Sequence, residues 1–81
     1  MEDQTSQQEL TFGQQLVGLT FNPAGDEQVT RAKRLCAELA DMVNEQGTPE
    51  STYLFNLIKG NALREILNAQ MNVVKLLTLK Y

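Results

Sequence analysis

One short segment of this chain combines an aromatic ring, a tight turn, a helix start and nearby cations. Residues 19–26 read Leu-Thr-Phe-Asn-Pro-Ala-Gly-Asp, and the helical pattern that follows carries Arg31, Lys33 and Arg34. A helix start offers unpaired backbone N–H groups and a partial positive charge, which suit a phosphate. An aromatic ring gives a nucleobase a face on which to stack. The segment therefore predicts either a site for a flat, anionic ligand or a turn and helix cap that only organises the fold.

The charges of the chain are unevenly distributed. Its 81 residues, enough for one small domain, carry a net charge of −3. A general DNA or RNA binder normally shows a basic face, so we expect no nucleic-acid partner of that kind. All seven Lys and Arg residues nevertheless lie in residues 31–81. A small anion can therefore find local positive potential on an acidic protein.

The sequence has no histidine and one cysteine. Without histidine, the Ser-His and Cys-His catalytic arrangements and most zinc sites are excluded. No carboxylate cluster indicates a hydrolytic pair or a metal cage, so we expect no catalytic residue, no metal and no cofactor. A single cysteine cannot form an internal disulfide, which fits a reducing cytosol. The sequence contains no apolar run of about 18 residues, so we expect no membrane span. Its acidic start is unlike a signal peptide.

The chain begins with a polar stretch, residues 1–9, which we expect to be a mobile acidic tail. Residues 10–19 are too apolar for a free tail. We expect them to pack on the helices, either of their own subunit or of a neighbour. Gly13 and Gly18 argue against a long helix in this segment.

The first long helix is predicted from Asp26 to about Gln46. Asp26 can cap it, with Glu27 in the first turn; in the alternative, Asn22 is the cap and Pro23 the first helical residue. Apolar residues in alternating steps of three and four form one stripe. They are Val29, Ala32, Cys36, Leu39 and Val43. The position of the cysteine in this stripe indicates a small buried hydrophobe.

The second helix is predicted to begin between Pro49 and Ser51, capped by Ser51 or Thr48, and to run to the C-terminus. Its apolar residues form two neighbouring rows, one of Phe55, Ile58, Ala62, Ile66, Ala69, Val73 and Leu76, the other of Leu63, Leu67, Val74 and Leu77. A single antiparallel partner cannot cover both rows. We therefore predict an all-α fold, an antiparallel two-helix hairpin with a short N-terminal segment, that assembles as a homo-oligomer.

Parts of the chain resemble a family of small phage proteins. Residues 11–14 (TFGQ) and 17–26 (VGLTFNPAGD) resemble the opening of that family, and residues 69–78 (AQMNVVKLLT) resemble its closing helix. The family comprises anti-defence sponges that share a helical-hairpin domain and counter the bacterial CBASS and Thoeris systems. The match covers residues 10–81, so the resemblance implies one sponge domain over that range.

The resemblance implies a hexamer that sequesters signalling nucleotides without degrading them. The implied ligands are cyclic dinucleotides, cyclic trinucleotides and, as in some members, cyclic ADP-ribose isomers. The implied place of action is the host bacterial cytoplasm, where binding keeps these messengers from activating immune effectors. The alternative is a small helical interaction module, an adaptor or inhibitor with no nucleotide ligand, which the wide apolar face of the second helix favours.

Four of the expected ligand-binding residues lie in or near the turn. Phe21 is expected to stack on a purine, and its alternative role is a core anchor at the helix entry. Asn22 and Gly25 offer side-chain or backbone hydrogen bonds, with Gly25 allowing close approach of the ligand. Lys33 matches the family's lysine at that spacing, which assigns it to a phosphate.

The fifth expected ligand-binding residue is Arg64, on a helix face crowded with leucine and isoleucine. It either pairs with Glu65 or Glu38, or is aimed at a ligand across a subunit seam. Arg31 and Arg34 are more typical of a solvated helix face.

Overall fold

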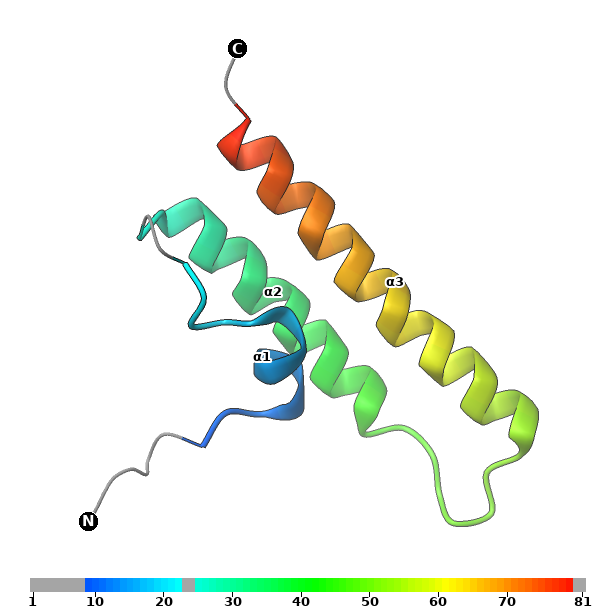
Figure 1. Ribbon diagram of the computed structural model, residues 1–81. Coiled ribbons are helices and arrows are strands. Elements are labelled where there is room, and N and C mark those ends of the chain that lie inside the picture. The colour runs from blue at the N-terminus through cyan, green and yellow to red at the C-terminus, as the bar shows by residue number, and fades with distance from the viewer. Residues whose placement is uncertain (1–8, 23–24, 80–81) are drawn as a thin grey trace.

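The structure is a computed structural model that describes residues 9–22 and 25–79, and these form three helices (Figure 1). Helix α1 spans Phe12–Val17, α2 spans Glu27–Asn44 and α3 spans Tyr53–Thr78. None of the described residues lies in a strand, so the predicted all-α class is confirmed. The expected tail up to residue 8, Pro23 and Ala24 of the predicted turn, and residues 80–81 lie outside the described residues.

Helix α1 is short because its own residues close it at both ends. The Thr11 hydroxyl accepts a hydrogen bond from the Gln14 backbone N–H at 3.1 Å, and the Gln14 side chain accepts one from the Thr11 N–H at 3.0 Å. This reciprocal pair is a capping box. Gly18 ends the helix in the left-handed region, with φ of 64°. Residues 10–19 therefore contain no long helix, as the glycines predicted.

Gly13 lets α1 approach α2 of the same chain closely. A Cβ at this position would overlap the carbonyl oxygen of Ala37. The Gly13 N–H also donates to the Asp41 carboxylate at 2.6 Å, so a side chain of α2 satisfies one of the unpaired donors at the start of α1. The N-terminal segment thus packs on its own subunit.

Asp26 caps α2, as predicted. Its carboxylate accepts hydrogen bonds from the backbone N–H groups of Gln28 at 2.8 Å and Val29 at 3.3 Å. The alternative with Asn22 as the cap is therefore wrong. Asn22 instead braces the first turn from outside, because its amide donates to the Asp26 carbonyl and the Thr30 hydroxyl, both at 2.8 Å.

The buried side of α2 shares Val29 with the predicted stripe but otherwise differs from it. Leu39 is 46% exposed and Cys36 is half-buried, with partial burial raising the pKa of its thiol. The buried residues are Val29, Lys33, Ala37 and Ala40. The reason is that α2 packs against two helices, α1 and α3, so the residues that lie toward both of them are buried. Small alanines allow both helices to approach there.

Helix α3 begins at Tyr53, one residue later than a cap at Ser51 would place it and four residues later than a cap at Thr48. Thr52 is the cap, and its hydroxyl accepts from the Phe55 N–H at 3.0 Å. The predicted caps Ser51 and Thr48 bind each other in the preceding loop. The Thr48 N–H donates to the Ser51 hydroxyl at 2.7 Å, and the Ser51 N–H donates to the Thr48 carbonyl at 3.0 Å. Prediction of these caps was wrong because the loop uses both hydroxyl-bearing residues itself.

Helix α3 lies alongside α2 and runs in the opposite direction (Figure 1). Lys59 of α3 donates to the carbonyls of Asn44 at 2.9 Å and Gln46 at 2.7 Å, which satisfies acceptors at the end of α2. The 26 residues of α3 extend about 39 Å, against about 27 Å for the 18 residues of α2. One end of α3 therefore projects beyond its partner.

The three helices form a thin layer. The Cα extents are 46 × 43 × 12 Å, so the smallest is about the diameter of one helix. A layer this thin leaves large apolar side chains exposed on α2 and α3. They include Leu35, Leu39, Met42, Leu54, Ile58, Val73 and Leu76. In the part of the chain that the structure describes, no helix has the length and apolar character needed to cross a membrane.

Candidate functional site

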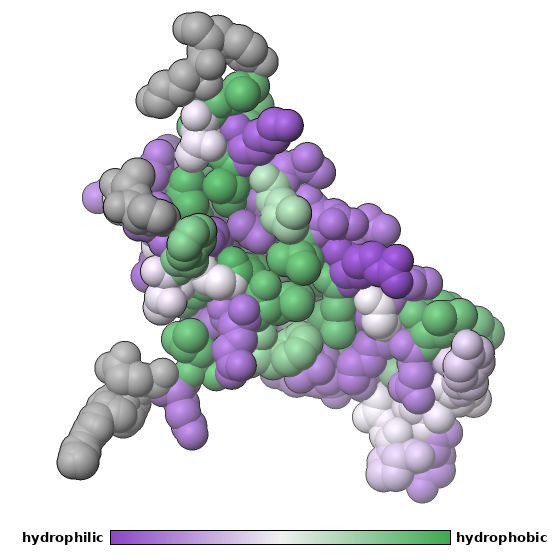
Figure 2. Space-filling model, viewed as in Figure 1, coloured by the Kyte–Doolittle hydropathy of each residue, from purple (hydrophilic) through white to green (hydrophobic). Residues whose placement is uncertain are grey.

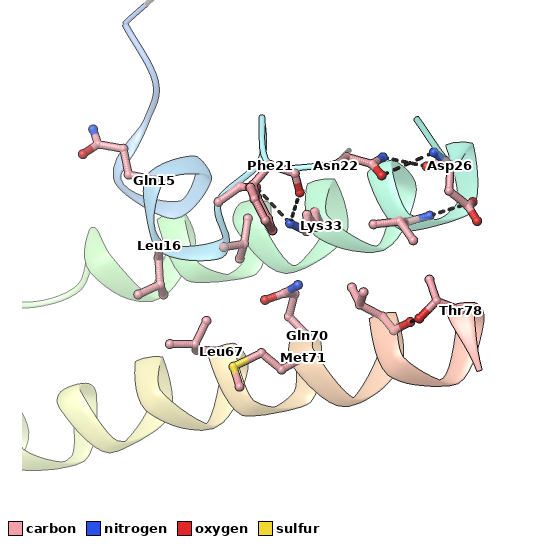
Figure 3. Close-up of a pocket in the computed structure, with 14 residues that line it drawn as sticks. Gln15, Leu16, Phe21, Asn22, Asp26, Lys33, Leu67, Gln70, Met71 and Thr78 are labelled. Carbon is pink, nitrogen blue, oxygen red and sulfur yellow. Dashed lines mark hydrogen bonds between the residues drawn. The ribbon is translucent and has the colours of Figure 1, made fainter. Parts of the chain in front are cut away.

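The candidate site is a cavity of about 640 Å³ where α1, α2 and α3 meet (Figure 3). Its volume lies within the roughly 300–1,000 Å³ of typical small-molecule sites. Most of the lining is apolar, from Leu16, Val17, Val29, Leu67, Met71 and Val74. In the view of Figure 2, hydrophobic residues gather in the middle of the molecule, and a further group of them lies at its right edge. The cavity can therefore accept a flat, largely apolar group.

Lys33 places a cation in the wall of this cavity. The side chain is only 5% exposed, and its ammonium donates to the carbonyls of Gly18 at 3.0 Å and Phe21 at 2.6 Å. The same nitrogen lies 5.5 Å from the centre of the Phe21 ring, within the range of a cation–π contact. An ammonium has three N–H groups, so one remains beyond these two acceptors. Lys33 therefore connects the segment after α1 to α2 and can still bind an anion.

Phe21 lines the cavity with most of its ring in solvent. The side chain is 72% exposed, so it is not a core anchor of this chain. Because Lys33 lies near the ring, the ammonium and the aromatic surface act on the same part of the cavity. This pairing suits a ligand that joins a stacking base to a phosphate.

Asn22 also lines the cavity, but its amide is already used. In addition to its two donated bonds, its oxygen accepts from the Asp26 N–H at 3.3 Å. Gly25 is exposed, adopts a φ of 65° and does not line the cavity. Its left-handed conformation serves the turn before α2. These two residues thus shape the helix entry in this subunit.

Arg64 is exposed and lies outside the cavity lining. It precedes the buried Ile66 by two residues, which places it about 200° around the helix axis from that buried position. The structure therefore brings together Phe21, Asn22 and Lys33, while Gly25 and Arg64 lie apart from them.

Gln70 of α3 is a cavity residue that the sequence reasoning did not select. It is 4% exposed, and its side chain makes no hydrogen bond to any residue that the structure describes. Figure 3 shows it projecting from α3 toward Lys33. Leaving a buried amide unpaired costs about 1–3 kcal/mol, so such groups are normally paired with protein, water or ligand.

The sequence contains a signal for both buried polar residues. Gln70 lies four residues after Ile66 and four before Val74, so a polar residue occupies a core position of α3. Lys33 likewise lies four residues after Val29 and four before Ala37. Polar residues at core positions of two adjacent helices are a pattern that could have identified this site.

The donors of the cavity suit an anion or a polar base edge. In the described ranges, no group of three or more His, Cys, Asp and Glu side chains is placed to hold a metal ion. The chemistry available here is stacking on an aromatic ring, charge-assisted hydrogen bonding and amide recognition within an apolar wall. No protein-family model, curated protein or solved structure matches this chain.

Proposed function

We propose that this protein binds and sequesters cyclic oligonucleotide second messengers without cleaving them. The cavity between α1, α2 and α3 carries the proposal, because it combines an apolar wall, the exposed Phe21 ring and the Lys33 ammonium. Cyclic dinucleotides, cyclic trinucleotides and cyclic ADP-ribose isomers all pair flat bases with phosphates. Each therefore presents the two kinds of group for which this cavity has partners.

The roles in the proposed site follow from the contacts. The Phe21 ring stacks on a purine, a contact worth about 1–3 kcal/mol per base. The remaining N–H group of the Lys33 ammonium donates a hydrogen bond to a phosphate oxygen. Asn22 holds the helix entry in place from the edge of the cavity. In this proposal, Gly25 and Arg64 contact the ligand from a neighbouring subunit.

The proposed sponge is a helical hairpin that assembles as a homohexamer. The thin layer of helices and the exposed apolar residues of α2 and α3 support self-association, because a second copy would remove those side chains from water. A hexamer also brings residues of several subunits to one ligand. The proposed setting is the cytoplasm of a phage-infected bacterium, where the protein blocks activation of CBASS and Thoeris immune effectors.

Sequestration acts by mass action. A sponge made in excess lowers the free messenger below the level that activates the effector. Competition with a sensitive effector needs nanomolar affinity, about −12 kcal/mol.

Calorimetry of the purified protein against a panel of cyclic dinucleotides, cyclic trinucleotides and cyclic ADP-ribose isomers tests this function. The bound samples are then heat-denatured, and the released ligand is identified by chromatography. We expect tight binding of at least one panel member and recovery of that ligand intact. Absence of binding across the panel contradicts the proposal, and recovery of a cleaved product replaces sequestration with catalysis.

The exposed apolar residues also support a second candidate, an interaction module that covers a partner protein with its α2 and α3 surface. Light scattering separates the two candidates. A sponge is a monodisperse homo-oligomer on its own, whereas an adaptor is polydisperse until its partner is added.

A further inference from the structure

Gln70 is a buried polar residue that lines the cavity and whose side chain has no hydrogen-bond partner among the described residues. It is only 4% exposed and lines the cavity, and its side chain forms no hydrogen bond within the described ranges. The side chains beside it on α3, Leu67, Met71 and Val74, are apolar and offer its amide only packing contacts. An amide held in such a wall presents one donor and one acceptor side by side toward the cavity.

The two polar groups of the cavity match different parts of a nucleotide. Lys33 offers only donors, which suit the acceptor-only oxygens of a phosphate. The Gln70 amide offers an acceptor beside a donor, so its oxygen has no partner on a phosphate. The edge of a nucleobase does supply a donor beside an acceptor.

We propose that Gln70 is the specificity-determining residue of this cavity, and that it reads the edge of an adenine base. The inference rests on the proposed function and adds the base preference to it. Adenine presents the N6 amino group next to the N7 acceptor, and glutamine pairs with both. On the same edge guanine presents two acceptors, O6 and N7, so the Gln70 oxygen would face another acceptor.

Binding of cyclic di-AMP and cyclic di-GMP to the wild type and three variants tests the inference. Gln70→Leu keeps the approximate volume and removes both polar atoms, whereas Gln70→Glu keeps the shape and removes the donor. The control is Asn61→Leu, because Asn61 is an exposed amide of α3 outside the cavity. Calorimetry gives the ratio of the two dissociation constants for each protein, and circular dichroism gives its melting temperature.

We expect the wild type and Asn61→Leu to prefer cyclic di-AMP by roughly 5- to 150-fold, the range of one good bidentate pair. Gln70→Leu should bring this ratio close to one without lowering the melting temperature, because it removes an unpaired buried amide. Gln70→Glu should keep a preference for cyclic di-AMP, since on the same edge a carboxylate still accepts from the adenine N6 amino group but faces two acceptors on guanine. Both ligands carry the same phosphate charge, so the added negative charge cancels in the ratio.

Four outcomes overturn the inference. If Gln70→Leu keeps the wild-type preference, the amide is satisfied by water alone. If the wild type binds both ligands equally, the sponge function stands and the adenine preference falls. If the wild type binds no member of the wider panel, both proposals fall together. A strong loss of melting temperature in both Gln70 variants assigns the residue a structural role instead.

Discussion

The ammonium nitrogen of Lys33 lies 2.6 Å from the carbonyl oxygen of Phe21 and 5.5 Å from the centre of the same residue's ring. Its bond to the Gly18 carbonyl at 3.0 Å ties the end of α1 to the same point. One buried side chain therefore positions the aromatic residue of the cavity and supplies the cation. Its structural role and its proposed ligand-binding role can be separated by experiment.

Lys33→Met should weaken both the fold and ligand binding. It leaves two carbonyl oxygens without their charged donor, so we expect a loss of about 1–3 kcal/mol in the free energy of unfolding. Urea denaturation measures this loss. Binding of cyclic di-AMP should fall more than tenfold, as calorimetry at a temperature below the melting transition would show. Unchanged unfolding with reduced binding would mean that the carbonyl contacts add nothing to stability.

Phe21→Ala should reduce ligand affinity with little effect on the fold. The ring is 72% exposed, so its removal should change the free energy of unfolding by about 0.5 kcal/mol or less. Loss of one base stack should cost about 1–3 kcal/mol of binding free energy. Tyr53→Ala is the control, because Tyr53 is an 82% exposed aromatic residue outside the cavity. Equal affinity in the two variants would remove Phe21 from the site.

Gly13→Ala and Gly60→Ala should have opposite effects on stability. A Cβ at Gly13 overlaps the Ala37 carbonyl oxygen, so α1 must shift, at a cost of about 1–3 kcal/mol. Gly60 has open space around its Cβ position in the interior of α3, where alanine should stabilise by about 0.5–1 kcal/mol. Urea denaturation of both variants measures the difference. A tolerated Gly13→Ala would mean that α1 is not held closely against α2.

Gly13→Ala also serves as a control for Lys33→Met. It disturbs the docking of α1 while the Lys33 charge remains. If the two variants lose the same affinity for cyclic di-AMP, the effect of Lys33→Met comes from the displaced segment. A larger loss in Lys33→Met assigns the lysine to the ligand.

Leu39→Glu should disrupt the proposed assembly. Leu39 is 46% exposed on α2, so a charge there is tolerated by the single chain but opposes burial against a second copy. Multi-angle light scattering should show an oligomer for the wild type and for the control Gln28→Glu, which alters an exposed polar residue of the same helix. The Leu39→Glu variant should form an assembly of lower mass. A monomeric wild type would contradict self-association.

The sequence by itself determined the elements whose causes are local. Helix α2 begins at Asp26 because its carboxylate reaches backbone N–H groups two and three residues further along. Gly18 ends α1 because glycine adopts the left-handed conformation without steric cost. The all-α class follows from apolar spacings of three and four residues. The N-cap of α3 was harder to predict, because several neighbouring hydroxyl-bearing residues could each cap the same helix.

Only the tertiary structure decided which sides of the helices are buried and which residues meet. Helical spacing gives the period of an apolar stripe but not the positions of the neighbouring helices. Because α1 packs closely on α2 at Gly13 and Ala37, Ala37 is buried and Leu39 is exposed. Lys33 and Gln70 are 37 positions apart, and although each interrupts the apolar pattern of its own helix, neither pattern shows that the two residues line the same cavity. They line one cavity because α2 and α3 pack side by side, which depends on the shapes of both helices together.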